Sequence, residues 1–180
     1  YLFMVRDDKG CTAATEPAET LIGEPATLTL AATLDSTIAC HGETTSISVS
    51  REGGNSTFEY SIDGGATWQT ETTFGSLAAR GEGYTVTVRD DKGCTATSTP
   101  VAVSEPAVLT LAAAIDSAIS CHGGTTQVTL TAAGGNTTFE YSRDNGSTWQ
   151  SGNRFGDLAA GTYLFMVRDD KGCTAATEPA

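Results

Sequence analysis

The chain has 180 residues, with 22 acidic against 10 basic side chains and a formal net charge of −12. Nucleic acid and anionic membranes both select basic patches, so this charge disfavours either as a partner. No apolar run approaches the ~20 residues that a membrane-spanning helix needs, so membrane insertion is not expected.

Several motifs of the sequence recur 81 residues further on, which indicates tandem domains. Residues 1–18 are also identical to residues 163–180. We therefore expect three parts: residues 1–23 are the C-terminal strands of a preceding repeat, 24–104 a complete repeat, and 105–180 a second repeat that lacks the end of its last strand. On this interpretation the chain is a segment of a longer array.

The first 23 residues contain two short strand patterns around the turn sequence Asp7-Asp8-Lys9-Gly10. This pattern predicts a hairpin formed by the last two strands of a sandwich. An isolated hairpin is marginally stable in water. We expect these residues to be ordered only against neighbouring protein.

The residues of the first complete unit predict short strands separated by turns rich in Gly, Asn and Asp. The expected strands cover residues 28–38 and 46–50, the two strands of a hairpin over 58–69, and residues 74–77, 84–88 and 94–103, and the second unit repeats them. Seven short strands in this order predict an all-β fold of tandem immunoglobulin/fibronectin III-like β-sandwich repeats. The predicted core consists of Phe58, Tyr60, Trp68, Leu77, Tyr84 and Val86, with their equivalents in the second unit.

Residues 58–69 and 139–150 combine an alternating strand, a turn signal and a tryptophan, which predicts a β-hairpin. The pattern Ser-x-Asp-x-Gly-x-Thr-Trp fits both copies and resembles the Asp-box of sialidase propellers. In that family the box is a folding device, so the resemblance implies a structural hairpin. Propeller blades recur at about 40–50 residues, so the longer repeat here excludes a propeller. The structural hairpin residues are Ser61, Asp63, Gly65, Trp68, Ser142, Asp144, Gly146 and Trp149.

Leu164 and Met166 occupy outward positions of a predicted strand, where the first unit has Thr85 and Thr87. Leu2 and Met4 repeat the apolar pair. Apolar residues on both faces of a strand indicate burial against another surface. Lateral contacts between filaments and a partly covered surface pair are both open interpretations.

Five cysteines recur in phase, at positions 11, 40, 94, 121 and 173, and indicate an oxidising, extracytoplasmic setting. Cysteines of small secreted domains usually pair within the domain, which predicts Cys40–Cys94 and Cys121–Cys173, with Cys11 pairing outside the chain. An immunoglobulin-type strand order places Cys40 and Cys94 at opposite poles, which instead allows Cys40–Cys173 across the junction. The two patterns exclude each other because bridged Cα atoms lie within ~7 Å. We favour the within-unit pairs.

Other candidate sites are weaker. Asp90, Asp91, Asp169 and Asp170 form acidic turns that are candidate calcium ligands, although the EF-hand spacing is missing. Zinc is disfavoured because each unit supplies one His and two distant Cys. Trp68 and Trp149 suit packing better than sugar stacking. No nucleophile with a base and no opposed carboxylate pair stands out, so we expect no enzyme and no cofactor.

The repeat as a whole resembles the SprB-type repeat of the very large gliding-motility adhesins of Bacteroidetes. The resemblance rests on Cys40-His41-Gly42, Gly53-Gly54, residues 58–61, and residues 84–94, with matching residues in the second unit. It implies stalk repeats of a filamentous surface adhesin that is exported through the type IX route and contacts neighbouring repeats and polysaccharide or another substratum. The alternative is a carbohydrate-binding β-sandwich module of a secreted protein.

Overall fold

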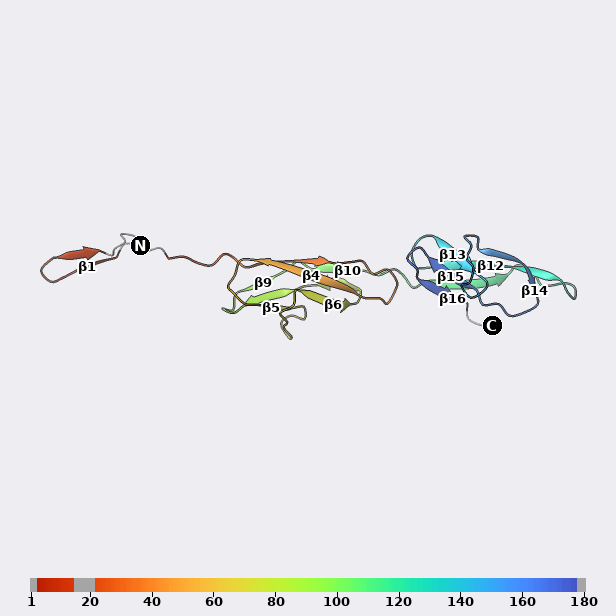
Figure 1. The fold of residues 1–180 in the computed structure, drawn as a ribbon, viewed down its shortest axis with the longest axis horizontal. Helices are drawn as coiled ribbons and strands as arrows, with labels where there is room; N and C mark the ends of the chain where they lie inside the picture. The colour runs from red at the N-terminus through yellow and green to blue at the C-terminus, as the bar shows by residue number, and fades with distance from the viewer. Residues whose placement is uncertain (1–2, 15–21, 178–180) are drawn as a thin grey trace.

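The structure is a computed structural model that describes residues 3–14 and 22–177, and this part of the chain contains strands and no helix. Two β-rich units follow one another along the long axis (Figure 1). The strands are β1 (Met4–Arg6), β2 (Thr12–Ala14), β3 (Thr29–Leu34), β4 (Thr45–Glu52), β5 (Phe58–Ser61), β6 (Thr73–Leu77), β7 (Arg80–Tyr84), β8 (Thr87–Asp90), β9 (Thr95–Thr97), β10 (Val101–Val103), β11 (Thr110–Ile115), β12 (Thr125–Ala133), β13 (Phe139–Ser142), β14 (Arg154–Ala159), β15 (Met166–Asp169) and β16 (Thr174–Ala176).

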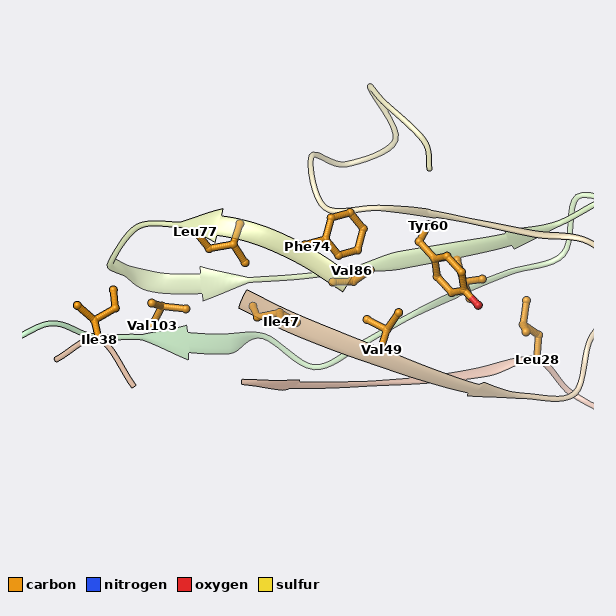
Figure 2. Packing of buried hydrophobic residues seen from close by; sticks show 10 residues of the cluster. Leu28, Ile38, Ile47, Val49, Tyr60, Phe74, Leu77, Val86 and Val103 are labelled. Atoms are coloured by element: carbon orange, nitrogen blue, oxygen red, sulfur yellow. The ribbon is translucent and has the colours of Figure 1, made fainter. Parts of the chain in front are cut away.

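The first unit is a β-sandwich of two antiparallel three-stranded sheets. One sheet has the order β3-β4-β6 and the other β5-β8-β9. Side chains of β4 alternate between the core and the surface, as the pleat of a strand requires. Its inward residues Ile47 and Val49 lie between the sheets (Figure 2). The fold is an immunoglobulin/fibronectin III-like β-sandwich, as the sequence predicted.

The core of the first unit agrees with the prediction except at Trp68. Tyr60, Leu77 and Val86 are buried, which confirms them as core residues (Figure 2). Phe58 and Tyr84 are partly buried and pack against the same cluster. The prediction for Trp68 is wrong, because its half-buried indole packs on its own hairpin, where its Nε1 donates to the carbonyl of Gly65 over 3.0 Å.

The predicted strand over residues 84–88 is divided in the structure. Arg80–Tyr84 form β7, which pairs with β10 in a separate two-stranded sheet. β8 begins at Thr87 and lies between β5 and β9 in their sheet. Gly83 allows the pairing of β7 with β10: it has a φ of +75°, and a Cβ there would lie 2.8 Å from the Val101 carbonyl oxygen. The predicted strand over residues 94–103 is likewise divided into β9 and β10, which belong to different sheets.

The second unit repeats the sandwich around its own core. Its sheets have the orders β11-β12-β14 and β13-β15-β16. The buried cluster consists of Val128, Leu130, Tyr141, Phe155, Leu158, Phe165 and Val167. The described residues after β16 include no counterpart of β10. Where Val103 is buried in the first unit, the second has an apolar groove of about 300 Å³ beside Ile115, Val128 and Leu158.

The N-terminal segment forms the predicted hairpin. β1 pairs antiparallel with β2, and Val5 lies opposite Ala13 as Val167 lies opposite Ala175. β15 also pairs with β13, but β1 and β2 pair with each other alone among the described strands. Phe3, Met4 and Val5 are accordingly more than half exposed. Leu2 lies outside the described residues. Within the described ranges, no helix is long and apolar enough to cross a membrane.

Candidate functional site

The most elaborate group of polar contacts lies at the junction of the two units. The first unit contributes the turn between β3 and β4, which contains Cys40, His41 and Gly42. Gly42 adopts a φ of +82°, which favours glycine, and the N–H of Glu43 closes the turn on the Cys40 carbonyl over 3.1 Å. The Glu43 carboxylate accepts the Cys40 N–H over 3.0 Å. The turn is thus fixed by its own residues and presents the Cys40 side chain.

The second unit contributes a site built around the buried carboxylate of Asp169. Its Oδ1 accepts the N–H groups of Lys171 and Cys173 over 3.0 and 2.9 Å. Its Oδ2 accepts the backbone and side-chain N–H groups of Asn136 over 2.8 and 2.9 Å. Burial raises the pKa of Asp169, but the N–H donors of Asn136, Cys173 and Lys171 outweigh burial and hold the pKa below its usual value.

Three residues that form polar contacts, Asn136, Gly42 and His41, and one disulfide join the turn to the second unit. Asn136 Nδ2 donates to the carbonyl of Ala39 over 3.0 Å. The N–H of Gly42 donates to Glu105 Oε2 over 2.6 Å. His41 Nδ1 lies 3.1 Å from the Pro106 carbonyl oxygen and 3.3 Å from Glu105 Oε1. Both of these neighbours accept hydrogen bonds, so the geometry requires that Nδ1 carries the hydrogen.

The covalent link is a disulfide between Cys40 and Cys173, whose Cα atoms are 5.5 Å apart. Our preferred pairs Cys40–Cys94 and Cys121–Cys173 are therefore wrong, and the alternative across the junction is present. The reason is topological. Cys94 lies near Asn55 at the pole of Ala26. The turn of Cys40 lies at the other pole, where its Gly42 bonds Glu105. Cys94, Cys121 and Cys11 are free and exposed.

The Asp-box residues come together inside each hairpin and hold its turn. Ser61 Oγ accepts the N–H of Gly65 over 2.8 Å and donates to Asp63 Oδ1 over 2.7 Å. Asp63 also accepts the N–H and the hydroxyl of Thr67, over 2.9 and 2.5 Å. These bonds, with the Thr67 hydroxyl first, hold the pKa of Asp63 far below its usual range.

The second hairpin repeats the Ser, Asp and Thr bonds of the first. Asp144 accepts from the Thr148 hydroxyl, the Thr148 N–H and the Ser142 hydroxyl, which lower its pKa to about 2. Gly146 takes the place of Gly65, and its N–H donates to Ser142 Oγ over 2.9 Å. In both hairpins the Ser, Asp, Gly and Thr residues of the box bond one another within the turn, which is a structural arrangement.

Each box tryptophan lies beneath an arginine. Arg89 lies 4.0 Å from the ring centroid of Trp68, and Arg168 lies 4.5 Å from that of Trp149. Arg89 also forms a two-nitrogen ion pair with Glu59, with both distances 2.8 Å. One face of each indole is therefore covered by its own unit.

Beside Trp149 the second unit has a polar pocket of about 210 Å³. Arg143, Arg154 and Gln150 contribute to its lining. The first unit has Ile62 and Thr73 at the positions of the two arginines. The basic character of this pocket is thus specific to the second unit.

The acidic turns do not assemble a metal site in the described part of the chain, where no group of three or more His, Cys, Asp and Glu side chains could hold an ion. Asp90 accepts N–H groups from Asn55, Lys92 and Cys94, as Asp169 does in its unit. Asp91 pairs with Lys92 over 3.1 Å. Asp90 and Asp169 therefore use their oxygens to fix turns, and Asp170 is exposed.

The apolar pair of Met166, the first residue of β15, and Leu164, two residues earlier, is only partly covered. Leu164 is 39% exposed and Met166 is half-buried beside the hairpin of Gly146. The corresponding Met4 is exposed.

Sequence reasoning missed the asparagines and the glutamates of the junction. The available signal was the recurrence of Gly-Gly-Asn at residues 53–55 and 134–136, and of Glu-Pro-Ala at 24–26 and 105–107, in phase with the cysteines. Asn side chains that bond nearby backbone are common in turns, so this signal predicted turns and no contact between units.

Comparisons with known proteins show the following. No family model matches the chain, and no curated protein matches it. Among solved structures, the N-terminal eight immunoglobulin domains of Down Syndrome Cell Adhesion Molecule are 17% identical, with a TM-score of 0.40, over 97% of this chain and 26% of that one. The four N-terminal immunoglobulin domains of Dscam1 isoform 8.4 are 14% identical, with a TM-score of 0.32, over 93% of this chain and 50% of that one.

The fibronectin(III)-like modules of Clostridium thermocellum CbhA are 15% identical to the chain, with a TM-score of 0.29, over 83% of this chain and 90% of that one. The chain thus spans about a quarter of the first of these structures and half of the second. These likenesses concern the sandwich fold alone.

Proposed function

We propose that the two units are structural stalk repeats of a large filamentous adhesin on a bacterial surface, with a role in attachment or gliding motility. The observation that carries the proposal is the junction. Two sandwiches with separate cores are joined end to end by the Cys40–Cys173 disulfide, with hydrogen bonds from Asn136 and Gly42 beside it. A covalent link at this place limits bending between repeats, as an extended stalk requires.

The same proposal places the protein outside the cell, on the outer surface, after export by the type IX route. A disulfide persists in an oxidising compartment and is rare in the cytosol, which supports this location. The partners are neighbouring repeats of the same chain, together with a surface polysaccharide or another substratum. Lateral contacts between filaments through Leu164 and Met166 belong to the proposal, as does a role without catalysis.

Immuno-electron microscopy tests this function. Antibodies raised against the 180-residue chain are applied to intact producing cells, with pre-immune serum as the control. Gold particles are expected along filaments that extend from the cell surface. Label that appears only after the cells are opened would contradict the proposal.

A second candidate function is carbohydrate binding by the second unit. The observation that favours it is the pocket of about 210 Å³ beside Trp149, with Arg143 and Arg154 in its lining. The arginines point to an acidic sugar. A glycan array separates this candidate from a purely structural role: Trp149→Ala abolishes binding and Trp68→Ala, its matched control, leaves it intact. Absence of any bound glycan removes the candidate.

A further inference from the structure

The molecule carries a second, unused copy of each half of its junction. At the outer pole of the first unit, Glu24, Asn55, Asp90 and Cys94 take the places of Glu105, Asn136, Asp169 and Cys173. At the outer pole of the second unit, Ser120-Cys121-His122-Gly123 take the places of residues 39–42. We call the first group the receiving site and the second the donor turn.

The receiving site is folded like its counterpart at the junction. Asp90 Oδ2 accepts the backbone and side-chain N–H groups of Asn55 over 3.0 and 2.7 Å. Asp90 Oδ1 accepts the N–H groups of Lys92 and Cys94 over 2.9 and 2.8 Å. Asn55 Nδ2 lies 3.8 Å from Cys94 Sγ, and Asn136 Nδ2 lies 3.7 Å from Cys173 Sγ. The site is therefore formed before any partner is present.

The two sites differ in what covers them. Cys173 is 8% exposed beneath the turn of the first unit, whereas Cys94 is exposed. Glu105 and Pro106 are half-buried, whereas their equivalents Glu24 and Pro25 are exposed. The exposure differs because the turn of residues 39–42 covers the site around Cys173 and leaves the site around Cys94 uncovered.

The donor turn also has the conformation of its counterpart. The N–H of Gly124 closes it on the Cys121 carbonyl over 3.0 Å, as Glu43 does for Cys40. Gly123 has a φ of +80°, close to the +82° of Gly42. Cys121 and His122 are exposed. Gly124 replaces Glu43, which bonds its own turn and not the partner, so the contact groups are unchanged.

We infer that the receiving site around Cys94 binds the Cys-His-Gly turn of another repeat of this kind, that the turn at Cys121 binds the receiving site of another repeat, and that each contact closes as a disulfide. In this complex Asn55 donates to the carbonyl before the partner cysteine, and Glu24 accepts from the partner glycine N–H and histidine. The inference rests on the proposed role of the units as stalk repeats. In such a stalk each repeat would be joined to the next by a disulfide.

The cross-link is an oxidation. The two thiols lose two protons and two electrons as the sulfur–sulfur bond forms, and a disulfide oxidant takes them up and is reduced to two thiols. Oxidised glutathione or an oxidoreductase with an active disulfide supplies this chemistry by thiol–disulfide exchange.

Cys11 provides a matched control within the same chain. It lies in the same Asp-Asp-Lys-Gly-Cys sequence as Cys94. Asp7 Oδ1 accepts the N–H groups of Lys9 and Cys11 over 3.0 and 2.8 Å, so the turn is the same. Its hairpin has no asparagine beside the thiol among the described residues 3–14. Random oxidation joins Cys121 equally to both thiols, whereas docking selects Cys94.

The experiment equilibrates the concentrated full chain in a glutathione redox buffer and maps the intermolecular disulfides by mass spectrometry without reduction. We expect the Cys94–Cys121 product to exceed the Cys11–Cys121 product roughly tenfold, the effect of one or two net hydrogen bonds. Asn55→Ala should bring this ratio toward one. Asn136→Ala, the same substitution in the occupied site, should leave the ratio unchanged.

A ratio near one in the unmodified chain, a ratio that Asn55→Ala does not change, or a main product of Cys94 with Cys94 would each overturn the inference. Circular dichroism reports that each variant is folded, whether or not its Cys40–Cys173 bond is closed. If the Cys94–Cys121 disulfide is not preferred while surface filaments are still labelled on cells, the stalk function stands and this inference alone is wrong.

Discussion

Cys40 and Cys173 are separated by 133 residues of sequence and belong to different sandwiches, yet they form one disulfide. Cys94 is the first unit's equivalent of Cys173, and it lies at the opposite pole of that unit from Cys40. A disulfide that crosses the junction does not stabilise either core directly. It restricts how the two units move relative to each other.

Removing this disulfide should loosen the junction and leave the units folded. In Cys40→Ser the remaining links are the hydrogen bonds of Asn136 and Gly42 and the contacts of His41 Nδ1, each contributing about 1 kcal/mol or less. The cores are separate, so both sandwiches persist. Fluorescence energy transfer between probes on the two units should show a broader distance distribution than in the unmodified chain. Cys94→Ser serves as the control, and an equally narrow distribution in both variants would count against the junction as the rigid element.

The amide of Asn136 should favour the oxidised junction. It bonds Asp169 within its unit and Ala39 across the junction, whereas Asn55 bonds Asp90 and, among the described residues, no carbonyl of another unit. Asn136→Ala should shift the Cys40–Cys173 equilibrium in glutathione toward the dithiol, by up to roughly tenfold for one hydrogen bond. Asn55→Ala should not shift it. Equal shifts in the two variants would mean that the asparagine acts only inside its own unit.

Local features of the fold could be predicted from the sequence because local residues determine them. The Asp-box hairpins follow from Ser61, Asp63 and Gly65, which bond one another within a few residues. The sandwich class follows from the order and alternation of the short strands. Division of the strand at Tyr84 could not be predicted, because Arg80-Gly81-Glu82-Gly83 has turn composition and forms β7 only through pairing with β10.

The cysteine pairing at the junction could not be predicted from local sequence patterns. The usual pairing of cysteines in small domains favoured Cys40–Cys94, and topology opposed it. The decisive quantity is the distance between poles, which depends on how all the strands stack rather than on any local pattern. Trp68 shows the same limit, since its side chain bonds Gly65 and lies under Arg89 instead of entering the core.

The stack of Glu59, Arg89 and Trp68 should contribute measurably to stability. Glu59→Ala removes an ion pair whose members are about 40% exposed, with a cost below about 1 kcal/mol. Arg89→Ala should cost more, because the contact of the guanidinium with the indole is lost as well, at about 0.5–1 kcal/mol. Urea unfolding of both variants measures the difference. If Arg89→Ala lowers the free energy of unfolding by no more than Glu59→Ala does, the contact of Arg89 with the indole does not contribute to stability.

Stability should fall in acid through the Asp-box carboxylates. The pKa values of Asp63 and Asp144 are lowered in the folded chain, the latter to about 2, so the unfolded chain binds protons first as the pH decreases. Their contribution is complete above the ordinary aspartate pKa of about 3.9 and is lost as the pH falls through the folded values. The melting temperature should be flat from pH 7 to about 4 and decline below.

The double variant Asp63→Asn, Asp144→Asn tests whether these two carboxylates cause the loss of stability in acid. The quantity to compare is the slope of melting temperature against pH, not the melting temperature itself. The melting temperature of the variant should decline less steeply below about pH 4, although Asp90 and Asp169, whose pKa values are also lowered, keep part of the dependence. An unchanged slope would assign the acid response to other groups.

The first glycines of the two Gly-Gly-Asn turns should be the least replaceable residues at the receiving poles. Gly53 and Gly134 have φ values of +71° and +74°, where an L side chain costs about 1–2 kcal/mol. A Cβ at Gly53 would also overlap the Thr27 carbonyl, and one at Gly134 the Val108 carbonyl. These are backbone atoms that precede β3 and β11, so relief of the overlap requires the chain after each Glu-Pro-Ala segment to move.

Gly53→Ala and Gly134→Ala should therefore each destabilise their own unit by more than about 2 kcal/mol in urea unfolding. Gly75 is the matched control: it has ordinary backbone angles and open space around its Cα, so Gly75→Ala should stay within about 0.5 kcal/mol of the parent. The two damaging substitutions should also expose the neighbouring asparagine site, and Gly134→Ala alone should slow formation of the Cys40–Cys173 bond during oxidative refolding. Wild-type stability in Gly53→Ala would show that this close approach of the two segments is not required.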